Sequence, residues 1–357
     1  MKIFIDRESS IAPFRQVKNR IMDLIESGEL KENQSIGSVR DVSRSVGVSP
    51  ATVQKAYLEL KQEKVIYSRA GAGYFVTKPS AVLSKNVFVF LPSSKLTFFT
   101  YILDGMFEAN RSNDLNIQIY SLSTDKLAWN EQTAELLRTA RRDRCSVIFI
   151  EEAFGGMRSE CLKTAQKVPF VTIEWLLDHS INIVNDYRSA GFEMIDYCIN
   201  RRRAQSVIVL KGREQQYNAR ERLIGMQKAA QRFKLIEGKN IVYLDTDFDA
   251  ISAYEAIKVH FSLQKRWDAV ICANDYEAMG AIGAFLEKRV LVGKDVVLIG
   301  FGNMIDSVTS YIPLTTMDQQ LKHIGMRAIS VIAALQKGYP LKERVITIPT
   351  RLIERMT

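Results

Sequence analysis

The sequence predicts an α/β protein in two parts, a small α+β unit at the N-terminus and a larger unit built on parallel sheets. Three observations lead to this prediction. Helical periodicity interrupted by a turn, followed by a Gly-rich hairpin pattern, occupies residues 38–76. From residue 87 onward, short β-branched apolar runs alternate with amphipathic helical patterns, which is typical of parallel sheets with helical crossovers. This alternation runs twice in series, so two similar halves with a cleft between them are expected.

Two short helices meet at a tight turn in the first part. Valines recur at helical spacing over residues 39–46, and Gly47 interrupts that helix. Ser49 offers an N-cap oxygen and Pro50 stands at the first position of the next helix, whose apolar residues continue over 53–60. The pattern predicts a helix-turn-helix.

A hairpin pattern follows the second helix. Residues 65–67 and 74–76 are strand-forming, and the segment between them is Gly-rich. Together with the helices, this predicts a winged helix-turn-helix domain over residues 1–77. The segment 78–86 contains proline, serines and lysine and is interpreted as a linker, so the larger domain is expected over 87–357.

The expected elements of the larger domain follow one another in a regular order. Strands are predicted at residues 87–91, 116–122, 146–150, 170–174, 206–212, 240–245, 269–275 and 296–302. Helices are predicted near residues 97–110, 128–142, 157–167, 187–202, 217–233, 249–264 and 276–288.

The composition limits the classes of function. The chain has 357 residues, 46% of them hydrophobic, and a net charge of +9. No apolar run reaches the about 18 residues of a membrane span and the first residues lack a signal-like pattern, so a cytoplasmic protein is expected. The four cysteines and three histidines are scattered, which argues against a zinc site and a Ser/His/Asp triad. We therefore expect no metal, no cofactor and no enzymatic activity.

The N-terminal domain resembles that of GntR-type transcription regulators over roughly residues 10–77. The residues that carry the resemblance are Pro13, Gln16, Val17, Ile21, Ile25, Gly28, Leu30, Ser38-Val39-Arg40, Val48-Ser49, Thr52-Val53 and Gly73-Tyr74-Phe75-Val76. The resemblance implies that the second helix of the turn motif reads the major groove of operator DNA and that the wing meets the minor groove.

The implied DNA-binding residues are Arg40, Ser49, Thr52, Lys55, Arg69 and Gly71. An arginine suits guanine edges or a phosphate, and hydroxyls and amides at a helix N-terminus suit phosphate oxygens. Pro50 stands where many relatives carry an arginine, so the operator sequence is not specified by these residues.

The larger domain resembles the effector-binding domain of LacI-type repressors, which shares the fold of periplasmic sugar-binding proteins. The resemblance is carried by Asp186, Gly191 and the segments 219–225, 273–275, 278–281, 299–301, 313–319 and 348–355. It implies three crossings between two lobes, near residues 184–186, 316–319 and 341–346. The first lobe is then expected at about 87–184 and 318–342, and the second at about 186–316 and 345–357.

A GntR-type domain joined to a LacI-type domain resembles arabinose-repressor-like regulators of sugar utilisation, a set that includes an L-fucose utilisation regulator. The motifs imply that Arg222 and Asp275 bind vicinal hydroxyls, that Gln319 adds a contact and that Phe248 stacks on the ligand. Further candidates at strand ends and at a crossing are Ser93, Ser94, Glu152, Trp175 and Asp186. Tyr187 follows Asp186 where relatives commonly have asparagine.

The function expected from these residues is a dimeric regulator, most simply a repressor, whose affinity for double-stranded DNA changes when a small sugar binds. A pentose or a 6-deoxyhexose such as L-arabinose or L-fucose is favoured. A purine or another flat effector remains an alternative, because Phe248 and Trp175 suit a planar ring. A pyridoxal-phosphate enzyme fusion and a sugar-binding transport protein are disfavoured, since neither a Schiff-base lysine motif nor an export signal is recognised.

Overall fold

The computed structural model describes residues 5, 12–26, 29–62, 65–69, 72–77, 83–92, 97–121, 126–151, 156–261, 267–339 and 343–357. The chain divides into two compact units, Met1–Leu83 and Ser84–Thr357. Most of the predicted linker lies outside the described residues. Each unit is described separately.

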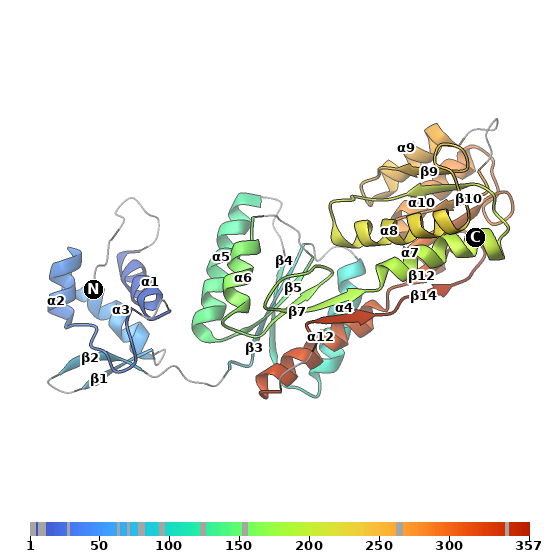
Figure 1. The fold of residues 1–357 in the computed structure, drawn as a ribbon. Helices are drawn as coiled ribbons and strands as arrows, with labels where there is room; N and C mark the ends of the chain where they lie inside the picture. The colour runs from blue at the N-terminus through green and yellow to red at the C-terminus, as the bar shows by residue number, and fades with distance from the viewer. Residues whose placement is uncertain are drawn as a thin grey trace. The chain divides into compact units, whose positions relative to one another are not determined.

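In its described residues, the N-terminal unit contains three helices and a two-stranded antiparallel sheet (Figure 1). In chain order these are α1 (Pro13–Glu26), α2 (Val39–Val46), α3 (Pro50–Gln62), β1 (Ile66–Arg69) and β2 (Gly73–Val76). Ile66 pairs with Val76 and Arg69 with Gly73, so the two strands form the predicted wing. Gly47 ends α2 in the left-handed region at φ 73°, where glycine is favoured.

Tyr57 ties the core of this unit together. Its side chain is fully buried among the apolar residues of the three helices and the wing. Its hydroxyl donates to the carbonyl oxygens of Ile36 and Gly37 at 3.1 and 3.3 Å, and its ring meets Tyr74 edge-on at 4.7 Å between ring centroids. The orientation of α3 relative to the wing is therefore set by both packing and hydrogen bonds.

The larger unit has two lobes, each built on a six-stranded sheet (Figure 1). The first sheet has the order β13-β7-β6-β5-β3-β4, with β3 (Asn86–Leu91), β4 (Asn116–Ser121), β5 (Ser146–Ile150), β6 (Phe170–Ile173), β7 (Ile181–Asn185) and β13 (Val345–Ile348). The second has the order β14-β12-β11-β10-β8-β9, with β8 (Val207–Leu210), β9 (Ile241–Leu244), β10 (Ala269–Ile271), β11 (Val297–Gly302), β12 (Thr315–Asp318) and β14 (Arg351–Ile353). Neighbouring strands are parallel except β14, which is antiparallel to β12.

Helices cover both faces of each sheet. The first lobe has α4 (Thr97–Asn110), α5 (Lys126–Asp143), α6 (Arg158–Ala165) and α12 (Leu321–Gln336). The second has α7 (Tyr187–Asp196) with the π-helical turn η1 (Tyr197–Arg201), α8 (Tyr217–Arg232), α9 (Ala250–His260), α10 (Asp275–Glu287) and α11 (Ile305–Thr309). Alternate residues of β3 pack against α4 and α12 on one face and against α5 and α6 on the other. The predicted order of strands and helices through residue 302 is confirmed, with β7 as an additional strand.

Glycines set the close packing of α7 against α8. A Cβ added to Gly191 would lie 2.1 Å from the carbonyl oxygen of Arg222, and one added to Gly225 would lie 2.0 Å from that of Arg188. Only glycine permits these two helices to approach so closely at both positions. The contact fixes the position of α8, the helix that carries Arg222.

The chain crosses between the lobes at Asn185–Tyr187, after β12 and after β13. The third crossing differs from the expected one near residues 341–346. Val345–Ile348 pairs in parallel with Asn182–Asn185, so this strand belongs to the sheet of the first lobe, and the chain changes lobe at Pro349–Thr350. The composition of a short apolar strand does not specify which sheet it joins, because strand pairing is a long-range contact.

No helix among the described residues combines the length and the hydropathy needed to cross a membrane.

Candidate functional site

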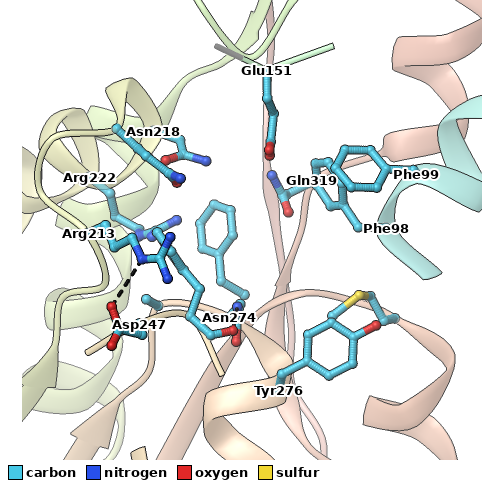
Figure 2. A pocket seen from close by; sticks show the side chains of 15 residues that line it. Phe98, Phe99, Glu151, Arg213, Asn218, Arg222, Asp247, Asn274, Tyr276 and Gln319 are labelled. Carbon is cyan, nitrogen blue, oxygen red and sulfur yellow. Dashed lines mark hydrogen bonds and ion pairs between the residues drawn. The ribbon is translucent and has the colours of Figure 1, made fainter. Parts of the chain in front are cut away.

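A cavity of about 230 Å³ lies between the two lobes, where the carboxyl ends of parallel strands face each other (Figure 2). Its aromatic and apolar lining consists of Phe98, Phe99, Phe248, Ala273, Tyr276, Phe301 and Met304. Its polar lining consists of Glu151, Arg213, Gln216, Asn218, Arg222, Asp247, Asn274 and Gln319. Flat apolar surfaces beside a few polar groups are what a small polar ring needs for binding.

Arg222 is the most unusual group of the cavity wall. Its side chain comes from α8, is only 3% exposed, and places its Cζ 4.3 Å from the centroid of the Phe301 ring. Among the described residues its Nη2 has no hydrogen-bond partner. Burial lowers the pKa of Arg222 to about 10, against the opposing effect of Glu277 and Glu174, so the guanidinium stays charged at neutral pH. A buried, charged donor without a partner requires an acceptor.

Phe248 is held rigidly on the same lobe. Its backbone adopts φ 61°, its N–H donates to Glu277 Oε1 at 3.1 Å, and its carbonyl oxygen accepts from Asn274 Nδ2 at 2.8 Å. A Cβ added to Gly212 would lie 2.5 Å from a Phe248 ring carbon, so glycine leaves the space that the ring occupies. Burial raises the pKa of Glu277 to about 7. The ring is thus positioned by two other segments, one that carries Gly212 and one that carries Asn274 and Glu277.

Two glutamates end neighbouring strands of the first lobe. Glu151 follows β5 at φ 59° and lines the cavity, and Glu174 follows β6 at φ 66°. Burial raises the pKa of Glu151 to about 7. Burial, together with Glu151, raises the pKa of Glu174 well above its ordinary value, while Arg222 acts in the opposite direction. Glu174 accepts a hydrogen bond from the Tyr187 hydroxyl, and its Oε1 has no partner among the described residues.

A polar network connects the lobes at the crossings. Gln319 Nε2 donates to Asn185 Oδ1 at 3.3 Å and to the Tyr187 hydroxyl at 3.2 Å. Asn185 Nδ2 in turn donates to the carbonyl oxygens of Gln319 and Ile348, each at 3.1 Å. Tyr187, the departure noted in the sequence, therefore joins Glu174 of the first lobe to Gln319 at the second crossing.

Three of the predicted ligand residues line the cavity: Arg222, Phe248 and Gln319. Ser93, Ser94 and Glu152 lie outside the described residues. Glu151, the neighbour of Glu152, is on the wall and was missed, although it directly follows a buried strand.

Three other predicted ligand residues lie off the cavity wall. Asp275 is fully buried and accepts hydrogen bonds from the backbone N–H of Met304 at 2.8 Å and the hydroxyl of Thr316 at 2.6 Å, and burial raises its pKa to about 6. Trp175 is buried in the first-lobe core, where its Nε1 donates to the Phe149 carbonyl oxygen at 3.2 Å.

The third, Asp186, caps α7 by accepting from the Ser189 N–H at 3.1 Å. For the Ala273-Asn274-Asp275 motif, the residue on the cavity wall is Asn274, because α10 begins at Asp275 and turns that carboxylate towards β11 and β12. The sequence motif located the correct strand end, but the residue that lines the cavity is Asn274 and not the predicted Asp275.

Of the DNA-reading candidates in the N-terminal unit, Thr52 is half-buried and the following are exposed: Arg40, Ser49, Lys55 and Arg69. Ser49 caps α3 through a hydrogen bond of 3.1 Å from the Thr52 N–H, and the two hydroxyls lie 2.8 Å apart. Lys55 Nζ lies 3.9 Å from the centroid of the Phe14 ring, and Arg40 is exposed on α2. In the wing, Arg69 donates to the Tyr67 hydroxyl at 2.7 Å, while Gly71 lies outside the described residues.

Residues 13–76 match the bacterial regulatory proteins of the gntR family, and residues 185–357 match the periplasmic binding protein-like domain. The HTH-type transcriptional regulator RegA of Clostridium saccharobutylicum is 25% identical over 346 residues, covering 89% of this chain and 98% of the relative. The HTH-type transcriptional repressor PurR of Photobacterium profundum is 24% identical over 335 residues, covering 90% and 98%. The fold is similar to a LacI family regulator from Enterococcus faecium solved with bound ribose, with a TM-score of 0.64 and 18% identity over 76% of this chain and 97% of that chain.

These relatives are a regulator and a repressor, not enzymes. Among the described residues no cluster of histidine, cysteine, aspartate or glutamate side chains is arranged to hold a metal ion. The chain is a DNA-binding transcriptional regulator that joins a GntR-type winged helix-turn-helix domain to a LacI-like, periplasmic binding protein-like domain.

Proposed function

We propose that this regulator represses a sugar-utilisation operon and that a small sugar, a pentose or a 6-deoxyhexose, controls it by binding in the cavity between the lobes. The observation that carries the proposal is the buried Arg222. It lines a cavity that also contains the ring of Phe248 and the carboxyl group of Glu151, and its Nη2 has no hydrogen-bond partner among the described residues. A monosaccharide presents hydroxyls that accept from a guanidinium and donate to a carboxyl group. It also has an apolar face that stacks on an aromatic ring.

The cavity wall explains how such a ligand acts on the fold. Glu151 belongs to the first lobe, Arg222 and Phe248 belong to the second, and Gln319 lies at a crossing. A ligand that contacts all of them binds one arrangement of the lobes more tightly than others and shifts the equilibrium towards it. By linkage, a coupling of about 1–3 kcal/mol changes operator affinity roughly 5- to 150-fold.

We propose that operator DNA is read by a homodimer. Arg40 and the N-terminal turn of α3, with Ser49, Thr52 and Lys55, face the major groove, and Arg69 in the wing faces the minor groove. Two such domains held about one helical turn apart match a two-fold symmetric site. The stacking of Arg69 on Tyr67 and Phe75, at 5.3 and 4.9 Å from its Cζ to the ring centroids, supports a preorganised wing.

The ribose bound to the Enterococcus faecium regulator supports a sugar as the effector class. A second candidate is a purine or another flat heterocycle, which is favoured by a different observation. Phe98, Phe99 and Phe248 all line the cavity, so that aromatic surface is available on both lobes. Planar heterocycles stack on such rings and present N–H groups and ring nitrogens to polar neighbours.

Isothermal titration calorimetry with D-ribose, L-arabinose, L-fucose, hypoxanthine and guanine tests the effector class. We expect one of the sugars to bind and to change the affinity of the protein for its operator in a gel shift. If a nucleobase binds and no sugar does, the sugar proposal is wrong and the purine-like effector is favoured. If none of the five binds, the cavity is not the effector site for either class.

A further inference from the structure

The two walls of the cavity carry different ionisable groups. Figure 2 shows Glu151 entering from the first lobe and pointing towards Gln319, while Arg213 and Arg222 enter from the second lobe. Arg213 is paired with Asp247 at 3.0 Å, whereas Arg222 forms no ion pair within the part of the chain that the structure describes. An effector that spans this space therefore meets a guanidinium donor at one end and a carboxyl group at the other.

Among the described residues, the surroundings of Glu151 contain little that stabilises its negative charge. The neighbouring strand end contributes a second carboxyl group, Glu174, whose own pKa is raised by burial and by Glu151, while burial raises the pKa of Glu151. Across the cavity stand Arg222, Arg213 with its partner Asp247, and Tyr276. The Tyr187 hydroxyl, which lies between the lobes, is occupied by Glu174 and Gln319. The empty cavity thus favours the neutral form of Glu151.

We propose that Glu151 is the specificity-determining residue of the first lobe: it selects an effector that presents hydroxyl or ring N–H donors to it, and it loses a proton when that effector binds. A carboxylate accepts two or more such hydrogen bonds, whereas a protonated carboxyl group accepts fewer and donates one. Ionisation is therefore favoured by a donor-bearing ligand and disfavoured by an anionic one. This inference rests on the proposed function, because it concerns the same cavity.

The direction of the pH dependence follows from this linkage. The pKa of Glu151 in the empty protein is about 7. Below that pH, binding must displace a proton, so affinity for a donor-bearing ligand rises up to about tenfold for each pH unit. Above about pH 8 the group is already ionised and the affinity is constant. A ligand with a phosphate ester or a carboxylate at this end is rejected at every pH above 7.

Calorimetry between pH 5.5 and 8.5, in two buffers with different ionisation enthalpies, measures both affinity and proton release. The probes are D-ribose, L-arabinose, L-fucose, hypoxanthine and, as the anionic counterpart, D-ribose 5-phosphate. For the neutral probe that binds, we expect proton release at pH 6.5 and a rise in affinity towards pH 8. Glu151→Gln is expected to weaken binding at pH 8 at least tenfold and to abolish both effects.

Glu135→Gln is the matched control. Glu135 lies on α5 of the same lobe, is 48% exposed in its side chain and pairs with Arg138 at 2.7 Å, away from the cavity. It removes the same charge and is expected to leave binding and its pH dependence unchanged. A second measurement needs no ligand: the melting temperature of Glu151→Gln should exceed that of the wild type at pH 8, and the difference should shrink as the pH falls towards the ordinary carboxyl pKa of about 4.5.

The outcomes separate this inference from the proposed function. If a neutral probe binds but Glu151→Gln retains affinity and proton release, the role given to Glu151 is wrong while the cavity remains the effector site. If proton release is lost in Glu174→Gln but retained in Glu151→Gln, the group that loses the proton is Glu174, and the inference is likewise wrong. If no probe binds the wild type, the proposed function fails and this inference fails with it.

Discussion

At the scale of single residues, Arg222 dominates the chemistry of the cavity. Its guanidinium is buried over the Phe301 ring, and its Nη2 has no hydrogen-bond partner among the described residues. An exposed arginine would donate the same hydrogen bond to water. A lysine at this position carries the same charge but lacks the planar fork that accommodates a ring on one face and acceptors at its edge.

Arg222→Lys should therefore weaken effector binding roughly 10- to 150-fold, which corresponds to about 1.5–3 kcal/mol for a hydrogen bond to a charged group. Calorimetric titration of wild type and variant with the effector measures this loss of affinity. Arg220→Lys is the control, because Arg220 lies on the same helix with a side chain that is 52% exposed. Equal effects of the two substitutions would contradict the assignment of Arg222.

Gly212 supports Phe248 through the space that it leaves empty. Gly212→Ala places a methyl group 2.5 Å from the Phe248 ring, and the backbone at φ 69° is unfavourable for alanine. We expect the ring to move and effector affinity to fall at least tenfold. Gly238→Ala is the matched control for backbone strain, since Gly238 has φ 76° and its added Cβ would touch nothing within 4 Å. It should lower stability without changing effector affinity.

At the scale of elements, α2 and α3 present DNA-reading candidates on a small, well-packed domain. Ser38 caps α2, Ser49 caps α3, and Tyr57 fixes α3 to the preceding loop. These contacts hold the helices in position without involving Arg40, which is exposed. A substitution of Arg40 therefore tests DNA contact rather than folding.

Arg40→Ala is expected to weaken operator binding by about 1–3 kcal/mol if the side chain reads a base edge. If it meets a phosphate, the loss is uniform across sequences and the salt dependence falls by about one counterion. Gel shifts at several salt concentrations distinguish the two, and effector affinity should stay unchanged. Lys31→Ala, which removes an exposed charge between α1 and α2, serves as the comparison. Wild-type operator affinity in Arg40→Ala would rule out its DNA contact.

At the scale of the whole molecule, buried carboxyl groups make stability depend on pH. Burial raises the pKa of Asp275 to about 6 and the pKa values of Glu277 and Glu151 to about 7. The folded protein binds these protons more tightly than the unfolded chain. The stabilisation is complete below the ordinary carboxyl pKa and is lost as pH rises through the folded values, at about 1.4 kcal/mol per pKa unit.

The melting temperature should therefore fall between pH 5 and pH 7, as calorimetric scans can determine. The pKa of Glu160 is lowered by Lys163 and Arg141, so its ion pairs stabilise the fold at neutral pH. This stabilisation is lost only as the pH falls below the ordinary pKa of about 4.5, outside the range from pH 5 to pH 7. A melting temperature that is constant or rises from pH 5 to pH 7 would show that these carboxyl groups are not desolvated in solution.

The sequence by itself determined the class of fold and the order of the elements. Local features carry that information: valine spacing over 39–46, the turn at Gly47, the cap at Ser49, and the repeated alternation of strands and helices each depend on neighbours in the chain. The strand ends that bear polar residues were recognised for the same reason.

Only the tertiary structure decided which side chains enter the cavity. Asn274 lines it while Asp275 turns inward to Met304, and Glu151 lines it from a position next to the one predicted. The third crossing also moved, because Val345–Ile348 joins β7. The direction of a side chain in the turn after a strand depends on where the next helix begins, as at Asp275, and the partner of a strand is a long-range contact. Neither is encoded in local periodicity.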